Sequence, residues 1–90
     1  MFSIKIEKPS YKQLQELNIE TWTQWECEPS TFDWEYECDE IAYVLEGKVK
    51  ITTKDGTTVE INQGDLVSFP KGLKCTWNVI KKIRKVYTFK

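Results

Sequence analysis

The chain has 90 residues, and we expect it to form one domain, residues 1–90. A domain of this size buries roughly 60 to 65% of the surface that its unfolded chain exposes. The sequence has no apolar run of the roughly 20 residues that a membrane span requires, and its first residues lack the apolar core of a signal peptide, so we expect a cytoplasmic protein without a membrane partner. Its three cysteines form no C-x-x-C pair, which indicates free thiols rather than a disulfide framework or a structural zinc site.

The net charge of −1 conceals a division along the chain. Residues 20–40 carry eight acidic side chains and no basic one, whereas residues 71–90 carry seven basic side chains and no acidic one. Because the basic residues alternate with strand-forming residues, we predict neighbouring strands whose exposed faces pair. The alternative is an electrostatic patch for an anionic ligand or a nucleic acid. We favour pairing and expect no nucleic-acid partner.

A short strand followed by a helix is predicted at the start of the chain. Apolar and charged residues alternate over residues 4–7, as they do in a strand. The run from Ser10 to Gln13 has the pattern of a capping box, with Ser10 as the N-cap. An apolar stripe then indicates a helix of about two turns, formed by Tyr11, Leu14 and Leu17. We expect this helix to lie as a lid over one end of the β-structure that follows.

The remainder of the chain has the pattern of an all-β protein. Short segments rich in Trp, Thr and Tyr alternate with turn residues from residue 19 onward. Asp55-Gly56 predicts a hairpin with a type I′ turn, and Gly47 predicts a tight chain reversal. Two further strands are predicted at residues 76–80 and 83–89, which gives about nine strands. A jelly roll of two antiparallel sheets fits this pattern, because a closed sheet hides its edges.

Two blocks of the sequence carry a recognisable spacing. The first runs Glu40-Ile-Ala-Tyr-Val-Leu-Glu-Gly47, and the second runs Gly64-Asp-Leu-Val-Ser-Phe-Pro70-Lys-Gly72-Leu-Lys-Cys75. They resemble the paired motifs of the cupin family, G-x5-H-x-H-x3/4-E-x6-G and G-x5-P-x-G-x2-H. The resemblance implies a small cupin-type double-stranded β-helix, an RmlC-like jelly-roll barrel. The overall pattern is similar to single-domain cupins grouped with the cupin domain of ureidoglycine aminohydrolase, a larger manganese-dependent enzyme that releases ammonia.

The resemblance places few of the family's metal ligands in this chain. Trp34 and Tyr36 stand where the first motif has its two histidines, and Cys75 stands where the second motif has its own. Glu40 matches the glutamate that is a metal ligand in the family, whereas Glu28 replaces the opening glycine. The chain contains no histidine at all. We therefore predict a barrel that keeps the family's turns and binds no metal cofactor.

Alternation along the strands predicts which side chains face the barrel interior. Even-numbered positions from 34 to 44 share one face, and Ala42 and Val44 identify that face as the inner one. Glu40 is then an inward-pointing carboxylate that needs a partner or a raised pKa. We predict a pocket for a small polar or cationic metabolite, stacked on rings and neutralised by the carboxylate. Its residues are Trp34, Tyr36, Glu40, Cys75 and Trp77.

Other interpretations of the same residues stay open. Cys75 and the aromatic side chains could serve core packing alone. A metal-dependent cupin enzyme could bind manganese, iron or zinc through Glu40, Cys75 and either Tyr36 or another carboxylate such as Asp39. Whether the protein is an enzyme is therefore left undecided, and no catalytic residue is assigned. A third interpretation is a structural module whose role is to form a homodimer. Trp22 and Trp25 are expected to be partly buried at the barrel edge or to form a dimer contact.

Overall fold

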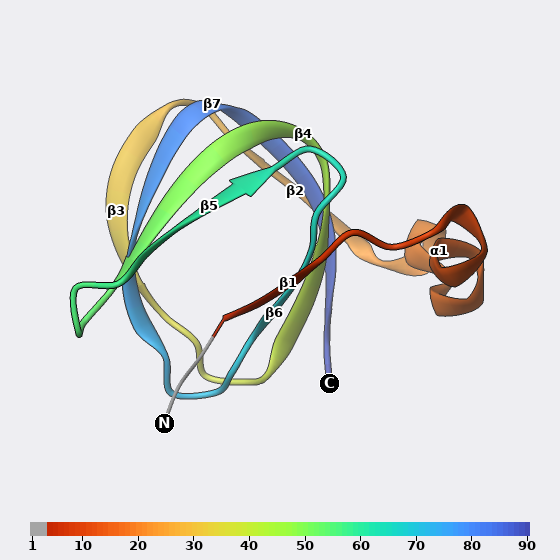
Figure 1. Ribbon diagram of the computed structural model, residues 1–90, viewed down its shortest axis with the longest axis horizontal. Helices are drawn as coiled ribbons and strands as arrows, with labels where there is room; N and C mark the ends of the chain where they lie inside the picture. Colours follow the sequence, from red (N-terminus) through yellow and green to blue (C-terminus); the bar gives the residue numbers. More distant parts are fainter. Residues whose placement is uncertain (1–3) are drawn as a thin grey trace.

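The computed structural model describes residues 4–90, which form an antiparallel β-barrel with a short helical arm beside it (Figure 1). In chain order the elements are β1 (Lys5–Glu7), α1 (Tyr11–Leu17), the 3₁₀ turn η1 (Ile19–Thr21), β2 (Thr23–Cys27), β3 (Ser30–Glu35), β4 (Glu40–Thr53), β5 (Thr58–Asn62), β6 (Leu66–Phe69) and β7 (Lys74–Phe89). The strand order is β1-β6-β4-β7-β2, with β3 also paired to β7 and β5 to β4. All pairings are antiparallel. The predicted all-β jelly-roll barrel with one short N-terminal helix is confirmed.

Two long strands, β4 and β7, hold the barrel together. They have 14 and 16 residues and pair with each other from one end of the barrel to the other. The two strands predicted at residues 76–80 and 83–89 are therefore parts of the single strand β7. Alternate side chains of both strands point inward and form most of the core, which includes Ala42, Val44, Val49, Ile51, Cys75, Trp77, Val79 and Ile83.

Gly47 does not reverse the chain, so the reversal predicted there is wrong. It lies within β4, in a stretch where the register against β7 shifts. Its φ angle is 107°, and a Cβ atom at this position would lie 2.4 Å from the backbone oxygen of Lys82. Glycine is needed because the β7 backbone passes too close for a side chain. Since β4 continues through this bend and β7 is one strand, residues 4–90 form seven strands instead of about nine.

A hairpin joins β4 and β5 where it was predicted, but its turn is not of type I′. The Gly56 N–H donates to the Thr53 carbonyl oxygen at 3.0 Å. Gly56 has a φ of 88°, while Asp55 does not have a positive φ, and a type I′ turn needs one at both central residues. The loop is instead a turn that ends in a left-handed glycine. The Asp55 carboxylate stabilises it by accepting a hydrogen bond from the Thr57 N–H at 3.0 Å.

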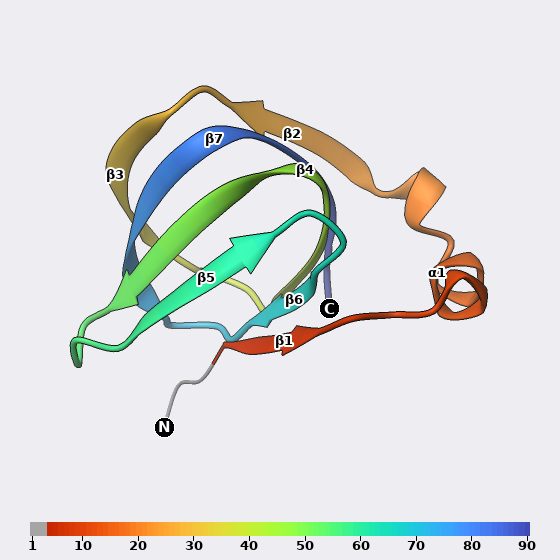
Figure 2. The same cartoon turned by 45° about the horizontal axis from the view of Figure 1, so that its top comes forward.

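Helix α1 begins as the sequence predicted, since the Ser10 hydroxyl oxygen accepts a hydrogen bond from the Gln13 N–H at 3.1 Å. It contains no buried residue. Figures 1 and 2 show it to one side of the barrel, at the end of an extended connection from β1, so the predicted lid is wrong. A groove of about 480 Å³ separates it from the outer side chains of Leu45 and Val86. Within residues 4–90, no helix has the length and apolar character needed to cross a membrane.

The acidic and basic segments of the chain become neighbouring strands, as predicted. Both β2 and β3 pair with β7, so the acidic segment lies along the basic one. Glu35 stands opposite Lys74 in the register, and the Glu28 carboxylate lies 3.6 Å from the Lys82 ammonium. An exposed ion pair such as that of Glu28 with Lys82 contributes little to stability, typically about 0 to 1 kcal/mol.

Candidate functional site

The barrel contains a cavity of about 620 Å³ between β2, β3, the segment that follows β3, and β7. This volume is within the range of pockets that bind small molecules. Seven aromatic side chains line it: Trp25, Phe32, Trp34, Tyr36, Trp77, Tyr87 and Phe89. The charged side chains in its lining are Asp33, Glu35, Glu37, Glu40 and Lys85. The cavity is therefore an aromatic pocket with more acidic than basic groups.

The aromatic side chains contact one another and fix the shape of the wall. Trp77 lies at the centre, with its ring centroid 5.8 Å from that of Trp25 and 6.0 Å from that of Phe32. Tyr36 stacks on Phe69 with a centroid distance of 4.6 Å. Such pairs add about 0.5 to 1.5 kcal/mol each beyond the burial of their surface. The rings of this wall therefore hold one another in fixed positions.

A buried ion pair lies in this wall. The Lys85 ammonium donates a hydrogen bond to Glu40 Oε2 at 2.9 Å, and both side chains are only 8% exposed. Four rings also surround the ammonium, with centroids 4.9 to 5.8 Å from Nζ, and they belong to Trp25, Phe69, Trp77 and Tyr87. A cation within about 6 Å of a ring face is attracted to it. The carboxylate and the rings together compensate for the removal of this charge from water.

Burial changes the proton affinities of three groups in and beside the cavity. Desolvation lowers the pKa of Lys85, and the Glu40 carboxylate opposes that effect. Burial raises the pKa of the Cys75 thiol above its ordinary value of 9.0. It also raises the pKa of the Tyr36 hydroxyl far above its ordinary range, and the nearby charges of Glu40 and Cys75 add to this. Tyr36 and Cys75 are therefore neutral near pH 7.

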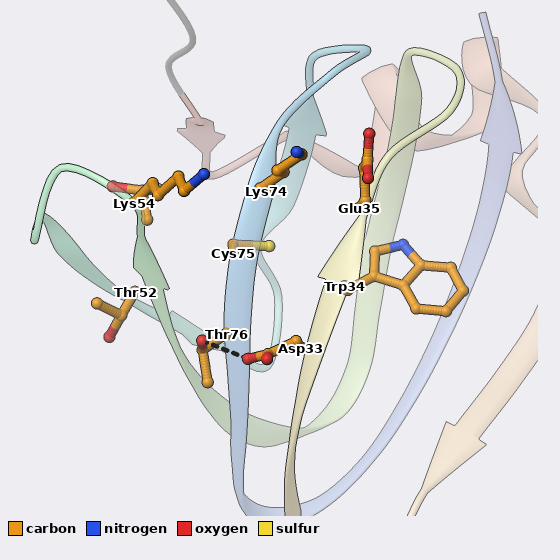
Figure 3. A pocket seen from close by; sticks show the side chains of 9 residues that line it. Asp33, Trp34, Glu35, Thr52, Lys54, Lys74, Cys75 and Thr76 are labelled. Atoms are coloured by element: carbon orange, nitrogen blue, oxygen red, sulfur yellow. Dashed lines mark hydrogen bonds between the residues drawn. The ribbon is translucent and has the colours of Figure 1, made fainter.

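The structure brings four of the five predicted pocket residues together. Trp34, Tyr36, Glu40 and Trp77 line the cavity, and all except Trp34, which is 52% exposed, are buried. Cys75 is also buried but lines a neighbouring cavity of about 530 Å³, which Trp34 shares. Cys75 and Trp34 stand opposite each other on β7 and β3, and Figure 3 shows the indole extending away from the thiol. Glu40 and Cys75 therefore do not face a common space.

Alternation predicted the inward positions of β4 correctly and those before it only in part. Tyr36, Ala42 and Val44 are buried together with Glu40, as expected, whereas Trp34 in β3 is half exposed. Cys38, assigned to the same face, is exposed, because β3 ends at Glu35 and β4 begins only at Glu40. Alternation does not continue through the non-strand segment between them.

Sequence reasoning missed Lys85, Trp25, Phe32 and Tyr87 as cavity residues. Lys85 was grouped with the exposed basic side chains of the last strand. A signal was present, since Ile83, Lys85 and Tyr87 alternate and all point inward from β7. Trp25 stands opposite Lys85 in the register between β2 and β7. That pairing depends on strand register, which the sequence did not define.

The cavity does not fit the metal ion that the resemblance to cupins implies. Glu40, the one matching ligand, is already hydrogen-bonded to the Lys85 ammonium. Cys75 is a neutral thiol in a different cavity, whereas a metal requires the thiolate. In the part of the chain from residue 4 onward, no group of three His, Cys, Asp or Glu side chains is placed to hold a metal. A cation side chain therefore stands beside the glutamate, where the family pattern would place the ion.

Comparison with known proteins identifies the family. The family model described as the EutQ-like cupin domain matches residues 14–87. A curated relative named acetate kinase EutQ, from Clostridioides difficile strain 630, is 39% identical over 62 residues, which are 69% of this chain and 39% of that protein. The chain therefore spans well under half of that relative's length.

Solved structures agree with this assignment. The crystal structure of a DUF861 family protein from Thermotoga maritima has a TM-score of 0.97 and 51% identity, covering 98% of this chain and all of that one. The Clostridium difficile EutQ structure has a TM-score of 0.65 and 38% identity, covering 71% of this chain and 50% of that one. The likeness to the ureidoglycine aminohydrolase group stays a prediction. By sequence and by fold, the chain belongs to the EutQ-like cupin family.

Proposed function

We propose that this cupin binds a small polar molecule that carries a positive charge, in the cavity of about 620 Å³. The observation that carries the proposal is the combination of seven aromatic side chains with unpaired carboxylates in one cavity lining. Aromatic faces attract cations, and an acidic surround adds to that attraction.

The carboxylates that would neutralise the ligand are those of Asp33, Glu35 and Glu37. All three residues are exposed, and none forms an ion pair within the described part of the chain, although Asp33 Oδ1 accepts a hydrogen bond from the Thr76 hydroxyl at 2.8 Å. Glu40 was expected to serve this purpose, but its charge is already balanced by Lys85. The ligand's positive charge would therefore lie at the exposed mouth of the cavity, beside these three carboxylates.

Trp34 is the side chain best placed to stack on an entering ligand. It is 52% exposed, and its ring contacts that of Tyr36 edge-on at a centroid distance of 6.4 Å. A stacked cation on such a ring gains about 0.5 to 2 kcal/mol. The remaining rings in the lining are more deeply placed and set the shape of the space, except Phe89, which is 59% exposed.

The proposal is tested by calorimetric titration of the purified protein with a panel of small ammonium compounds and their uncharged analogues. We expect the charged compounds to bind more tightly, and Trp34→Ala to weaken their binding by roughly 2- to 30-fold. Tyr11→Ala is the matched control, because Tyr11 is an exposed aromatic residue on α1, outside this cavity. Absence of binding across the panel, or equal binding by the Trp34→Ala variant, contradicts the proposal.

The name of the curated relative suggests a second activity, acetate phosphorylation. Both acetate and a nucleotide phosphate are anionic, and three unpaired carboxylates at the mouth disfavour them in this cavity. Titration with acetate in the same experiment separates the two. Binding of acetate with no binding of ammonium compounds would favour the enzymatic alternative.

Two expectations about the protein's setting also remain proposals. We propose a cytoplasmic location, supported by the free and exposed thiol of Cys38, which would be liable to oxidation elsewhere. We also propose a homodimer, because a 90-residue domain gains stability from association. Sedimentation at two protein concentrations tests the second proposal.

A further inference from the structure

The Lys85 ammonium has more hydrogen-bond donors than the protein uses. A lysine ammonium carries three N–H donors. Lys85 donates one hydrogen bond, to Glu40 Oε2 at 2.9 Å, and makes no second one with residues 4–90. Buried donors are normally satisfied, because an unsatisfied one loses its hydration without compensation. The aromatic rings around Nζ attract its charge but supply no oxygen acceptor.

A second buried donor lies nearby. The Trp77 side chain is buried, and its indole N–H is directed toward the Tyr36 hydroxyl and the Cys75 thiol without a well-formed hydrogen bond to either. The Trp77 ring centroid is 4.9 Å from Lys85 Nζ. The interior wall thus presents unused donors at Lys85, whereas the exposed part of the lining presents acceptors at Asp33, Glu35 and Glu37.

We propose that the natural ligand is a small zwitterion, whose carboxylate oxygen accepts a hydrogen bond from Lys85 and whose ammonium group lies among the mouth carboxylates. Lys85 then presents a fixed positive charge to the ligand's oxygen, beside the Glu40 carboxylate. This inference rests on the proposed function, because it names the chemical class of the ligand that the same cavity binds.

The arrangement of charges distinguishes a zwitterion from the simpler alternatives. A plain cation would satisfy the mouth but leave the Lys85 donors without an acceptor. A plain anion would have to pass three unpaired carboxylates. A molecule with both charges matches both regions, and the cavity volume of about 620 Å³ limits it to the size of a free amino acid or a compound somewhat larger.

The test compares three probes of equal carbon chain length by calorimetry: 4-aminobutyrate, butylammonium and butyrate. We expect the wild-type protein to bind 4-aminobutyrate roughly tenfold or more tightly than butylammonium, since a hydrogen bond to a charged group is added. In the double variant Lys85→Met, Glu40→Gln, which leaves no unpaired charge in the wall, this ratio should fall to about one. Lys81→Met is the matched control for loss of one positive charge, because Lys81 is an exposed β7 residue outside the cavity.

A second measurement removes dependence on whether the double variant folds. With ¹³C-labelled lysine in the wild-type protein, the Lys85 side-chain signal should shift on addition of 4-aminobutyrate but not of butylammonium. Equal affinities for these two probes in the wild type, or a ratio that persists in the double variant, would overturn the inference and leave the proposed function intact. If neither probe nor any compound of the ammonium panel binds, the proposed function itself fails.

Discussion

The buried pair of Lys85 and Glu40 should make the two single variants much less stable than the double variant. Both side chains are 8% exposed and 2.9 Å apart, so removing one partner leaves the other as an unpaired charge in the barrel wall. Breaking such a pair typically costs about 3 to 5 kcal/mol, whereas replacing both partners by neutral residues of similar volume is often close to neutral. We expect Lys85→Met and Glu40→Gln each to lose stability in this range, and Lys85→Met, Glu40→Gln together to lose about 1 kcal/mol or less.

Urea denaturation of the four proteins, followed by tryptophan fluorescence, measures this cycle. In a domain of this size, 1 kcal/mol corresponds to a shift in Tm of roughly 4 to 8 °C, so the single variants should melt at clearly lower temperatures than the double variant. Additive effects would refute the reasoning, because additivity would mean that the two charges do not interact. Losses under about 1 kcal/mol in both single variants would likewise show that water reaches the pair.

The remaining predictions concern the barrel and its helical arm. Burial raises the pKa of the Cys75 thiol, so the thiol contributes stability that is fully present below pH 9.0 and is lost as the pH rises through its folded-state pKa. Between about pH 9 and 11, the Cys75→Ala variant should therefore lose less stability than the wild type. Urea denaturation at each pH measures the difference. Gly47→Ala should lower the free energy of unfolding by about 3 kcal/mol or more, because strain at a positive φ is joined by a clash with the β7 backbone. Gly64→Ala is the control: its φ is positive but the space around it is open, so it should lower the free energy by only about 1 to 2 kcal/mol. Equal losses of stability in thermal melts would contradict this. Ser10→Ala should speed amide hydrogen exchange in α1 without lowering the global Tm, since α1 contains no buried residue. A fall of several degrees in Tm would show that the helix is part of the cooperative unit.

The fold could be predicted better than the site, because turns and caps depend on neighbouring residues whereas the site is formed by residues far apart in the sequence. The hairpin at Gly56 and the cap at Ser10 depend on neighbouring residues, so their positions were predicted correctly. The path at Gly47 was mispredicted because this glycine is required by the close approach of the β7 backbone at Lys82, 35 residues further along the chain. Neighbouring residues in the sequence do not indicate such an approach.

The difference between local signals and long-range contacts also explains which cavity residues could be predicted. Tyr36, Glu40 and Trp77 were found through alternation and motif spacing, which are local. Lys85 was missed because a lysine in a strand of alternating basic residues is usually exposed. Its burial follows from the pairing of β2 and β4 with β7, which places Trp25 and Glu40 around it. Only long-range register carries that information, and turn chemistry and binary patterning do not fix it.

The ammonium beside Glu40 is attached to the backbone of β7. A metal ion can dissociate, and the occupancy of a metal site therefore varies with how much of that ion the surroundings supply. A lysine is present in every copy of the folded chain from the moment of synthesis. The positive charge beside Glu40 is consequently encoded at position 85 of the sequence and does not depend on the supply of an ion.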